Sequence, residues 1–325
     1  MIFIVLPCLV LLYILLINFL YELFCAKEKS VQEKHVVVIG GSSGIGKAFA
    51  CLAAQKGAHV TIIARNEDRL RLAVEEIKKD RLNDSQRTKS ISLDVSDYDQ
   101  VNGCLLSLDD ELPIYMLMNC AGLAICGIIE DVSEENVKKM FDVNYYGTHN
   151  AIKTLVPRFK TRKEGHIVLT GSQASLLGIY GYTTYAATKF ALRGLAEALA
   201  MELKHYNIHV TLALPPDTNT PGFQEENKSK PEETRLITES AGIYQPKTVA
   251  QAILKDVLKG SFFSYIGMES FLLTTLCVGM TSHRKYYELA YHCILLGPFK
   301  LISSFYLGNF HKIINDCAKK NKKAD

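Results

Sequence analysis

The sequence predicts an α/β fold with a doubly wound parallel sheet. Short apolar segments alternate with segments of helical periodicity from His35 to about Gly260. Several of the apolar segments are nearly uninterrupted, which is typical of parallel strands buried on both faces. Alternation of this kind places ligands at the carboxyl ends of the strands. Two further apolar regions lie outside this segment, one before it and one after it.

The first apolar region, residues 2–24, contains only Asn18 and Glu22 as interruptions, and its length suits a bilayer-spanning helix. It has neither the basic start nor the small-residue cleavage site of a signal peptide. We therefore expect residues 1–26 to form an uncleaved transmembrane anchor. Three lysines follow it: Lys27, Lys29 and Lys34. The positive-inside rule then predicts that the rest of the chain faces the cytosol.

Composition limits the possible partners and the compartment. The 37 Lys and Arg residues nearly balance the 34 Asp and Glu residues, and the net charge of +3 argues against nucleic-acid binding. Nine cysteines are scattered without a CxxC pair. This distribution indicates reduced thiols in the cytosol, and it argues against a disulfide framework or a zinc site.

A glycine-rich segment, Gly40–Gly46, lies between the predicted strand His35–Ile39 and a predicted helix at Lys47–Lys56. Glycines let the backbone turn tightly and approach a pyrophosphate at the helix N-terminus. Such a loop is often only a turn, but its position between strand and helix favours a dinucleotide site. The expected contacts are Gly40, Ser42, Ser43, Gly44, Ile45 and Gly46.

The second strand, Ala58–Ile63, indicates which nicotinamide cofactor binds. A carboxylate commonly follows this strand in NAD enzymes, whereas this chain has Ala64 and Arg65. A guanidinium there suits the 2′-phosphate of NADPH. The alternative is that Arg65 only caps a solvent-exposed edge.

The alternation continues to the end of the predicted domain. Helices are expected at 67–79, 98–112 and 134–159, and strands at 90–93, 114–118, 167–170 and 209–214. Polar or turn-forming residues follow these strands at Asp94–Val95, Asn119–Gly122, Gly171–Ser172 and Pro215–Thr218.

A tyrosine and a lysine are four residues apart on the helix that begins near Thr183. Tyr185 and Lys189 therefore share one helix face, and the ammonium should lower the pKa of the phenol. With the hydroxyl of Ser172, this pair has the groups needed to bind and protonate a carbonyl oxygen. Tyrosine and lysine at this spacing also occur by chance on solvated helix faces.

Four features together resemble the short-chain dehydrogenase/reductase family, which has a Rossmann fold. They are the GGSSGIG loop, the NCAG segment at 119–122, Asn144, and Ser172 with Tyr185-xxx-Lys189. The resemblance covers residues 35–260. It implies that Ser172 polarises the carbonyl, Tyr185 transfers the proton, Lys189 binds the nicotinamide ribose and Asn144 holds a water that relays protons.

The same resemblance implies further cofactor contacts. These are Asp94, Val95, Asn119 and Pro215, together with Tyr185 and Lys189. Two residues depart from the family pattern: Ile39 replaces the usual Thr before the first glycine, and Cys120 replaces the usual second Asn. Some local hydrogen bonds must therefore be made differently.

Longer segments, above all PPDTNTPGFQEENKSKPEETRLI, resemble the branch of the family that acts on sphingoid ketones. This resemblance implies NADPH-dependent reduction of 3-ketodihydrosphingosine to dihydrosphingosine at the endoplasmic reticulum membrane. The alternatives are a membrane-bound reductase of steroids, retinoids or 3-ketoacyl substrates, or a non-catalytic scaffold.

The remaining segments allow several interpretations. Residues 217–244 form either a lid or a solvated connection. Residues 261–325 are apolar with a basic tail, but Glu269, Lys300 and Gly297–Pro298 interrupt the apolar stretches. They lie at a membrane surface, close over a lipid site or form a dimer face, and a spanning hairpin is less favoured. The final KKAD matches a dilysine retrieval signal, or is only a solubilising tail.

Overall fold

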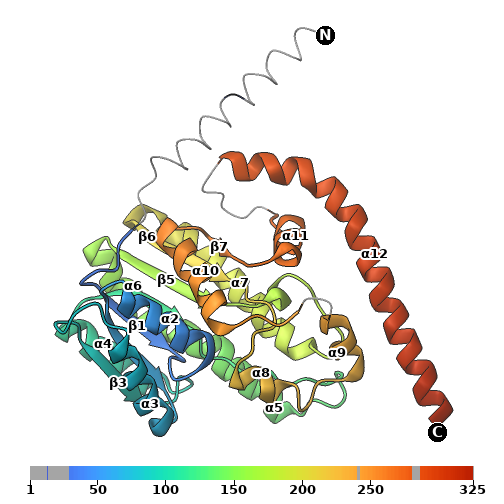
Figure 1. Cartoon of the computed structure of the whole chain (residues 1–325), viewed down its shortest axis with the longest axis horizontal. Helices are drawn as coiled ribbons and strands as arrows, with labels where there is room; N and C mark the ends of the chain where they lie inside the picture. The colour runs from blue at the N-terminus through green and yellow to red at the C-terminus, as the bar shows by residue number, and fades with distance from the viewer. Residues whose placement is uncertain (1–12, 14–28, 240–241, 280–285, 325) are drawn as a thin grey trace.

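A seven-stranded parallel sheet forms the centre of the molecule (Figure 1). The computed structural model describes residues 13, 29–239, 242–279 and 286–324, so the predicted anchor lies outside the described residues except for Tyr13. The strand order is β3-β2-β1-β4-β5-β6-β7. The bounds are β1 His35–Ile39, β2 His59–Ala64, β3 Thr88–Ser92, β4 Ile114–Asn119, β5 Gly165–Thr170, β6 Ile208–Ala213 and β7 Phe263–Ser264. From β1 the chain adds β2 and β3 on one side of the sheet and then β4 to β7 on the other. A crevice for ligands is expected between β1 and β4, where this order reverses.

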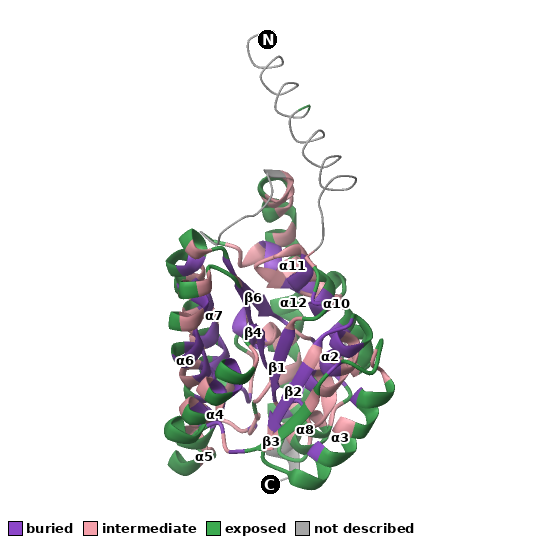
Figure 2. Ribbon diagram, turned by 90° about the vertical axis from the view of Figure 1, so that its left-hand side faces the viewer, coloured by how far each residue is buried: buried purple, intermediate pink, exposed green. Residues whose placement is uncertain are grey.

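Helices cover both faces of the sheet (Figure 2). Strand β1 shows why: Val36 and Val38 belong to one hydrophobic core, and Val37 and Ile39 belong to the other. Successive strand residues point to opposite faces, so a doubly covered strand must be apolar throughout. One face carries α2 Gly44–Gln55, α3 Glu67–Lys79 and α10 Pro246–Lys259, and the other carries α4 Tyr98–Glu111, α6 Gly147–Arg162 and α7 Thr183–Leu203.

The predicted doubly wound Rossmann sheet is confirmed, with small shifts at the ends of most elements. One predicted helix differs in kind. Residues 134–159 form α5 Glu134–Phe141, a π-helical turn at Asp142–Tyr146 and then α6. A π turn inserts one residue without stopping the helix, so the periodicity conceals it.

Residues 217–244 contain two short helices, α8 Pro221–Glu226 and α9 Glu232–Thr238. Thr220 caps α8, because its Oγ1 accepts a hydrogen bond of 3.1 Å from the amide of Phe223. Helices of about two turns are too short to produce a recognisable apolar periodicity. Strand β7 shows in addition that the sheet extends past residue 260.

Two helices follow the sheet, α11 Met268–Leu276 and α12 Tyr286–Ala324. The interruption expected at Gly297–Pro298 does not break α12, which is 39 residues long. Proline removes one hydrogen bond from a helix, but its fixed φ remains close to helical values. Among the described residues, α12 is the one helix long and apolar enough over 287–320 to cross a membrane, judged by length and composition. It contacts α9 and α11 and leaves large apolar side chains such as Ile294, Leu301 and Phe305 exposed (Figure 1).

A buried ion pair fastens α4 to α6. Arg162 donates hydrogen bonds of 2.7 and 2.9 Å to the two carboxylate oxygens of Asp109 and a third of 2.9 Å to the carbonyl of Ile114. The Asp109 side chain is 1% exposed and also accepts from the amide of Ile114. Removing the carboxylate leaves a guanidinium and an amide without their partner.

We expect Asp109→Ala to lower the free energy of unfolding by about 3 kcal/mol, because it breaks a buried, bidentate pair. Asp110→Ala is the matched control, since Asp110 pairs with Arg158 at the surface, where both side chains are 41–62% exposed. The control should change stability by less than about 1 kcal/mol. Denaturant unfolding in detergent measures both, and equal effects would contradict the prediction.

Candidate active site

The glycine-rich loop forms a cradle where β1 leads into α2. Gly40 has a φ of +77°, and a Cβ at this position would lie 2.6 Å from the amide nitrogen of Ala121. A Cβ at Gly46 would lie 2.3 Å from the carbonyl oxygen of Gly40. Only glycine allows these approaches. Ser43, the N-cap residue of α2, makes no side-chain capping bond, so the first amides of the helix are available to an anion.

A cavity of about 480 Å³ opens above this cradle. Most of the predicted cofactor contacts line it: Gly40, Ser42, Ser43, Gly44, Ile45, Gly46, Arg65 and Val95. Glycine backbone, a helix N-terminus and a cationic rim suit a dinucleotide phosphate. The residues present therefore fit a nicotinamide dinucleotide.

Five predicted cofactor contacts do not line this cavity, and two of them, Tyr185 and Lys189, line the neighbouring cavity instead. Asp94 lies at its edge, where its carboxylate accepts from the amide and hydroxyl of Ser96 at 2.9 and 2.7 Å. Asn119 is buried beneath it, and its Oδ1 accepts from the amide of Ala121. Pro215 lies instead on the substrate side, beside Ser172.

Two arginines that follow β2 line the cavity. Arg65 Nη1 lies 3.9 Å from Asp94 Oδ2, and its side chain is 62% exposed, so the guanidinium is accessible to a phosphate. Arg69, one turn into α3, also lines the cavity and is absent from the sequence-based prediction. The signal was available, because a residue in the first turn of the helix after β2 lies at the same sheet edge.

Cys120, which replaces the Asn usual in the family, accepts a hydrogen bond. Thr170 Oγ1 lies 3.3 Å from Cys120 Sγ and donates to it. This contact joins the loop that follows β4 to the last residue of β5. It is one of the local hydrogen bonds expected to differ from the family pattern.

Ser172, Tyr185 and Lys189 meet in a second cavity of about 160 Å³, adjoining the first. Ser172 follows β5 and caps a 3-10 turn at Gln173–Ser175, where its Oγ accepts from the amide of Ala174 at 3.2 Å. Lys189 Nζ donates to the carbonyl of Thr170 at 2.9 Å and lies 5.6 Å from the centre of the Tyr185 ring. The fold thus brings together the three residues predicted to act on a carbonyl.

The pKa of Tyr185, next to Lys189, differs from the prediction. Burial, followed by the charge of the Glu226 carboxylate, raises the pKa of Tyr185, although a hydrogen bond with Ser172 opposes the rise. Burial also lowers the pKa of Lys189 to about 8. The expected lowering of the tyrosine pKa is therefore wrong for this structure. The cause is desolvation, which disfavours both charged forms.

The raised pKa keeps the Tyr185 phenol protonated at neutral pH. A group that delivers a proton to a carbonyl oxygen needs this state. The arrangement consequently suits reduction of a ketone.

Asn144 is fully buried in the π-helical turn between α5 and α6. Its Oδ1 accepts from the amide of Leu123 at 2.8 Å, and its Nδ2 donates to the carbonyl of Leu123 and to Thr188 Oγ1. A Cβ at Gly122 would lie 3.3 Å from Asn144 Oδ1 and 3.5 Å from Lys189 Nζ. Glycine at this position keeps the space between the amide and the ammonium open.

A third cavity, of about 50 Å³, continues from Ser172 and Tyr185 toward the C-terminal helices. Leu273 of α11 and Phe310 of α12 line it. Gln173 Nε2 donates a hydrogen bond of 2.9 Å to Ser270 Oγ, which joins the loop after β5 to α11. The segment after β7 therefore lines part of this cavity, and closure over a lipid site was one of the alternatives that the sequence left open.

Known proteins share both the sequence and the fold. The profile of the short chain dehydrogenase family matches residues 34–231. The 3-ketodihydrosphingosine reductase of Bos taurus is 42% identical over 315 residues, which are 96% of this chain and 95% of that protein. The 3-dehydrosphinganine reductase of Danio rerio is 43% identical over 307 residues, covering 94% of this chain and 92% of that protein.

Solved structures agree at the level of the fold. A short-chain dehydrogenase from Sphingobium yanoikuyae, solved in complex with NADPH, superposes with a TM-score of 0.64 at 22% identity, covering 71% of this chain and 87% of that one. Levodione reductase gives a TM-score of 0.67 at 21% identity, covering 74% and 98%. With this sheet, this cradle and these relatives, the chain belongs to the short-chain dehydrogenase family.

Proposed function

We propose that this chain is an NADPH-dependent oxidoreductase that reduces 3-dehydrosphinganine (3-ketodihydrosphingosine) to sphinganine (dihydrosphingosine). The observation that carries the proposal is the cavity next to Ser172 and Tyr185, whose lining consists of carboxylates together with apolar side chains that include Leu273 of α11 and Phe310 of α12. A long-chain amino ketone has the same division into polar and apolar parts. The names of the full-length relatives support the same substrate.

NADPH is the proposed cofactor, held by the glycine cradle and by Arg65 with Arg69 at the 2′-phosphate. When bound, NADPH supplies the hydride that reduces the ketone carbon. The two guanidiniums and the absence of a carboxylate directly after β2 support NADPH over NADH.

The side chains provide the proton and fix the ketone. Ser172 and Tyr185 donate hydrogen bonds to the ketone oxygen, and Tyr185 then transfers its phenolic proton as that oxygen becomes a hydroxyl. The Lys189 ammonium stabilises the resulting tyrosinate. The open space at Gly122, between Lys189 and Asn144, supports a route by which solvent returns the proton.

The proposed location is the endoplasmic reticulum membrane, with the catalytic domain in the cytosol. The apolar helix α12 and the lysines after the predicted anchor support this placement. The amide of Lys29 donates a hydrogen bond of 2.9 Å to the carbonyl of Leu258, which ties the segment after the anchor to the end of α10. An anchor at residues 1–26 would thus hold the domain close to the bilayer.

Tyr185→Phe should reduce turnover of 3-dehydrosphinganine by about two to four orders of magnitude, because it removes the transferable proton and keeps the ring. The measurement is loss of NADPH absorbance in detergent micelles. NADPH binding, followed by its fluorescence, should be unchanged.

Wild-type protein should prefer the long-chain amino ketone to steroid, retinoid and 3-ketoacyl substrates in the same assay. A different preferred ketone would replace the proposed substrate. Near-normal turnover by folded Tyr185→Phe protein would refute the role of the phenol, and lack of turnover with any ketone would favour a scaffold.

Arg65→Ala should weaken NADPH binding by roughly 10–100-fold and leave NADH binding nearly unchanged, because the lost charge-assisted hydrogen bonds involve only the 2′-phosphate. Arg71→Ala is the matched control, since Arg71 is an exposed arginine of α3 paired with Asp68. Fluorescence titration measures both cofactors. Equal losses for NADPH and NADH would show that Arg65 has a structural role only.

The cytosolic placement is tested by protease and glycosidase treatment of intact microsomes. Asn83-Asp84-Ser85 and Asn227-Lys228-Ser229 are glycosylation acceptors, and Asn83 is exposed. We expect digestion of the catalytic domain by added protease and no mobility change with glycosidase. A glycan on either asparagine, or full protection without detergent, would place the domain in the lumen.

A further inference from the structure

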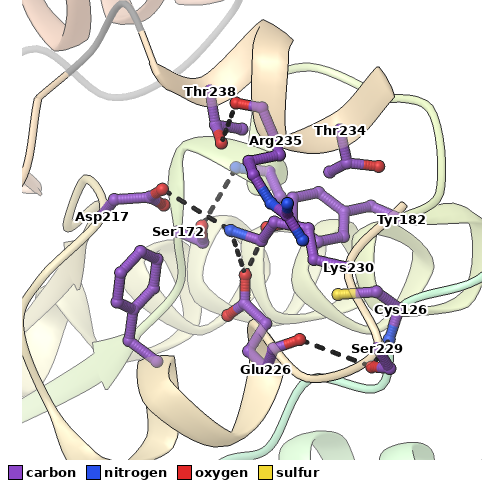
Figure 3. Close-up of polar contacts among 12 residues, drawn as sticks. Cys126, Ser172, Tyr182, Asp217, Glu226, Ser229, Lys230, Thr234, Arg235 and Thr238 are labelled. Atoms are coloured by element: carbon purple, nitrogen blue, oxygen red, sulfur yellow. Dashed lines mark hydrogen bonds and ion pairs between the residues drawn. The ribbon is translucent and has the colours of Figure 1, made fainter. Parts of the chain in front are cut away.

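A buried polar network lies near Ser172, on the substrate side of the active site (Figure 3). Its centre is Glu226, the last residue of α8. Glu226 Oε1 accepts a hydrogen bond from the Tyr182 hydroxyl and forms an ion pair of 2.9 Å with Lys230 Nζ. Lys230 Nζ also lies 3.7 Å from Asp217 Oδ2. The network thus joins three segments of the chain. Tyr182 directly precedes α7, Asp217 follows β6, and Glu226 and Lys230 lie at and just after the end of α8.

The network faces the reacting groups. Glu226 and Asp217 line both cavities that contain Ser172 and Tyr185, and the Tyr182 and Tyr185 rings are 5.3 Å apart. The side chains of Glu226 and Asp217 are 13% and 24% exposed, whereas that of Lys230 is 1% exposed. The carboxylates are therefore reachable from the cavity, and the ammonium lies behind them.

The charges of the network do not balance. Two carboxylates share one ammonium, and the third carboxylate at this cavity, Glu269, adds to the excess. Burial raises the pKa of Asp217 to about 6, even with Lys230 nearby. Charges buried without full compensation destabilise a fold, so such a site gains most from a cation that arrives with a ligand.

Apolar side chains line the same cavity as this network. They come from the loop before α7 and from α9, α11 and α12: Leu177, Ile179, Ile237, Leu273 and Phe310. A ligand that extends from the network along these walls must carry a cationic end and an apolar chain.

We propose that Glu226, with Asp217, binds the ammonium group of the substrate and thereby selects a ketone with an adjacent amine. The inference rests on the proposed function, because the 2-ammonium of 3-dehydrosphinganine is next to the ketone that Ser172 and Tyr185 hold. Lys230 and Tyr182 bind Glu226 Oε1, and Oε2 has no hydrogen bond to the described part of the chain. This oxygen is positioned as the acceptor for the substrate ammonium.

Binding of two amphiphiles to full-length protein in detergent tests the site without relying on turnover. The probes are sphinganine and a neutral long-chain 1,3-diol that lacks the amine. Glu226→Gln should weaken sphinganine binding by roughly 10–100-fold, since a charge-assisted hydrogen bond is lost, and should change diol binding less than about 3-fold. Asp217→Asn should show the same selectivity with a smaller loss.

Glu239→Gln is the matched control, because it makes the same charge change at an exposed position after α9. It should leave both affinities unchanged. NADPH binding confirms that each variant is folded, and Asp217→Asn provides the test if Glu226→Gln does not fold. Equal losses for the two probes, or no loss in either variant, would overturn the inference and would mean that the network only fastens α8.

The proposed reaction is judged separately. If wild-type protein reduces 3-dehydrosphinganine but binds both probes equally well, the ammonium site is wrong and the reductase assignment stands. If binding depends on Glu226 and on the amine, yet no ketone is reduced, the site stands and the proposed reaction fails.

Discussion

The active site depends on the close contact between the loops that leave β1 and β4. The amide of Cys120 donates a hydrogen bond of 2.7 Å to the carbonyl of Ile39, and Gly40 leaves no room for a side chain against Ala121. Because strand order reverses between these strands, the helices that follow them cover opposite faces of the sheet and leave a crevice for the dinucleotide. The cradle and the accessible amides of α2 follow from this one approach.

Burial has opposite consequences for the two halves of the catalytic pair. It raises the pKa of Tyr185, which keeps the proton that a reductase must donate, and lowers the pKa of Lys189. Glu226 adds to the first effect through its negative charge. The residue proposed to bind the substrate ammonium thus also influences the proton donor, so a bound cation beside Glu226 is expected to ease the formation of tyrosinate.

The C-terminal extension supplies apolar side chains to the cavity beside Ser172 and Tyr185. Helix α11 is joined to the loop after β5 through Gln173 and Ser270, and α12 supplies Phe310 to the cavity wall. The outer side of α12 exposes large apolar side chains. A helix that is apolar toward both the cavity and its surroundings is well suited to pass a lipid between a membrane and the catalytic tyrosine.

The sequence by itself determined the sheet, the cradle and the candidate catalytic residues that the fold brings together. These depend on local patterns: apolar strands such as His35–Ile39, glycines at a strand end, and the i, i+4 pair of Tyr185 and Lys189. Only the tertiary structure decided the raised pKa of Tyr185 and the network around Glu226. Each depends on burial or on contacts between residues distant in sequence, as when Tyr182 meets Glu226, and periodicity carries no information about such contacts.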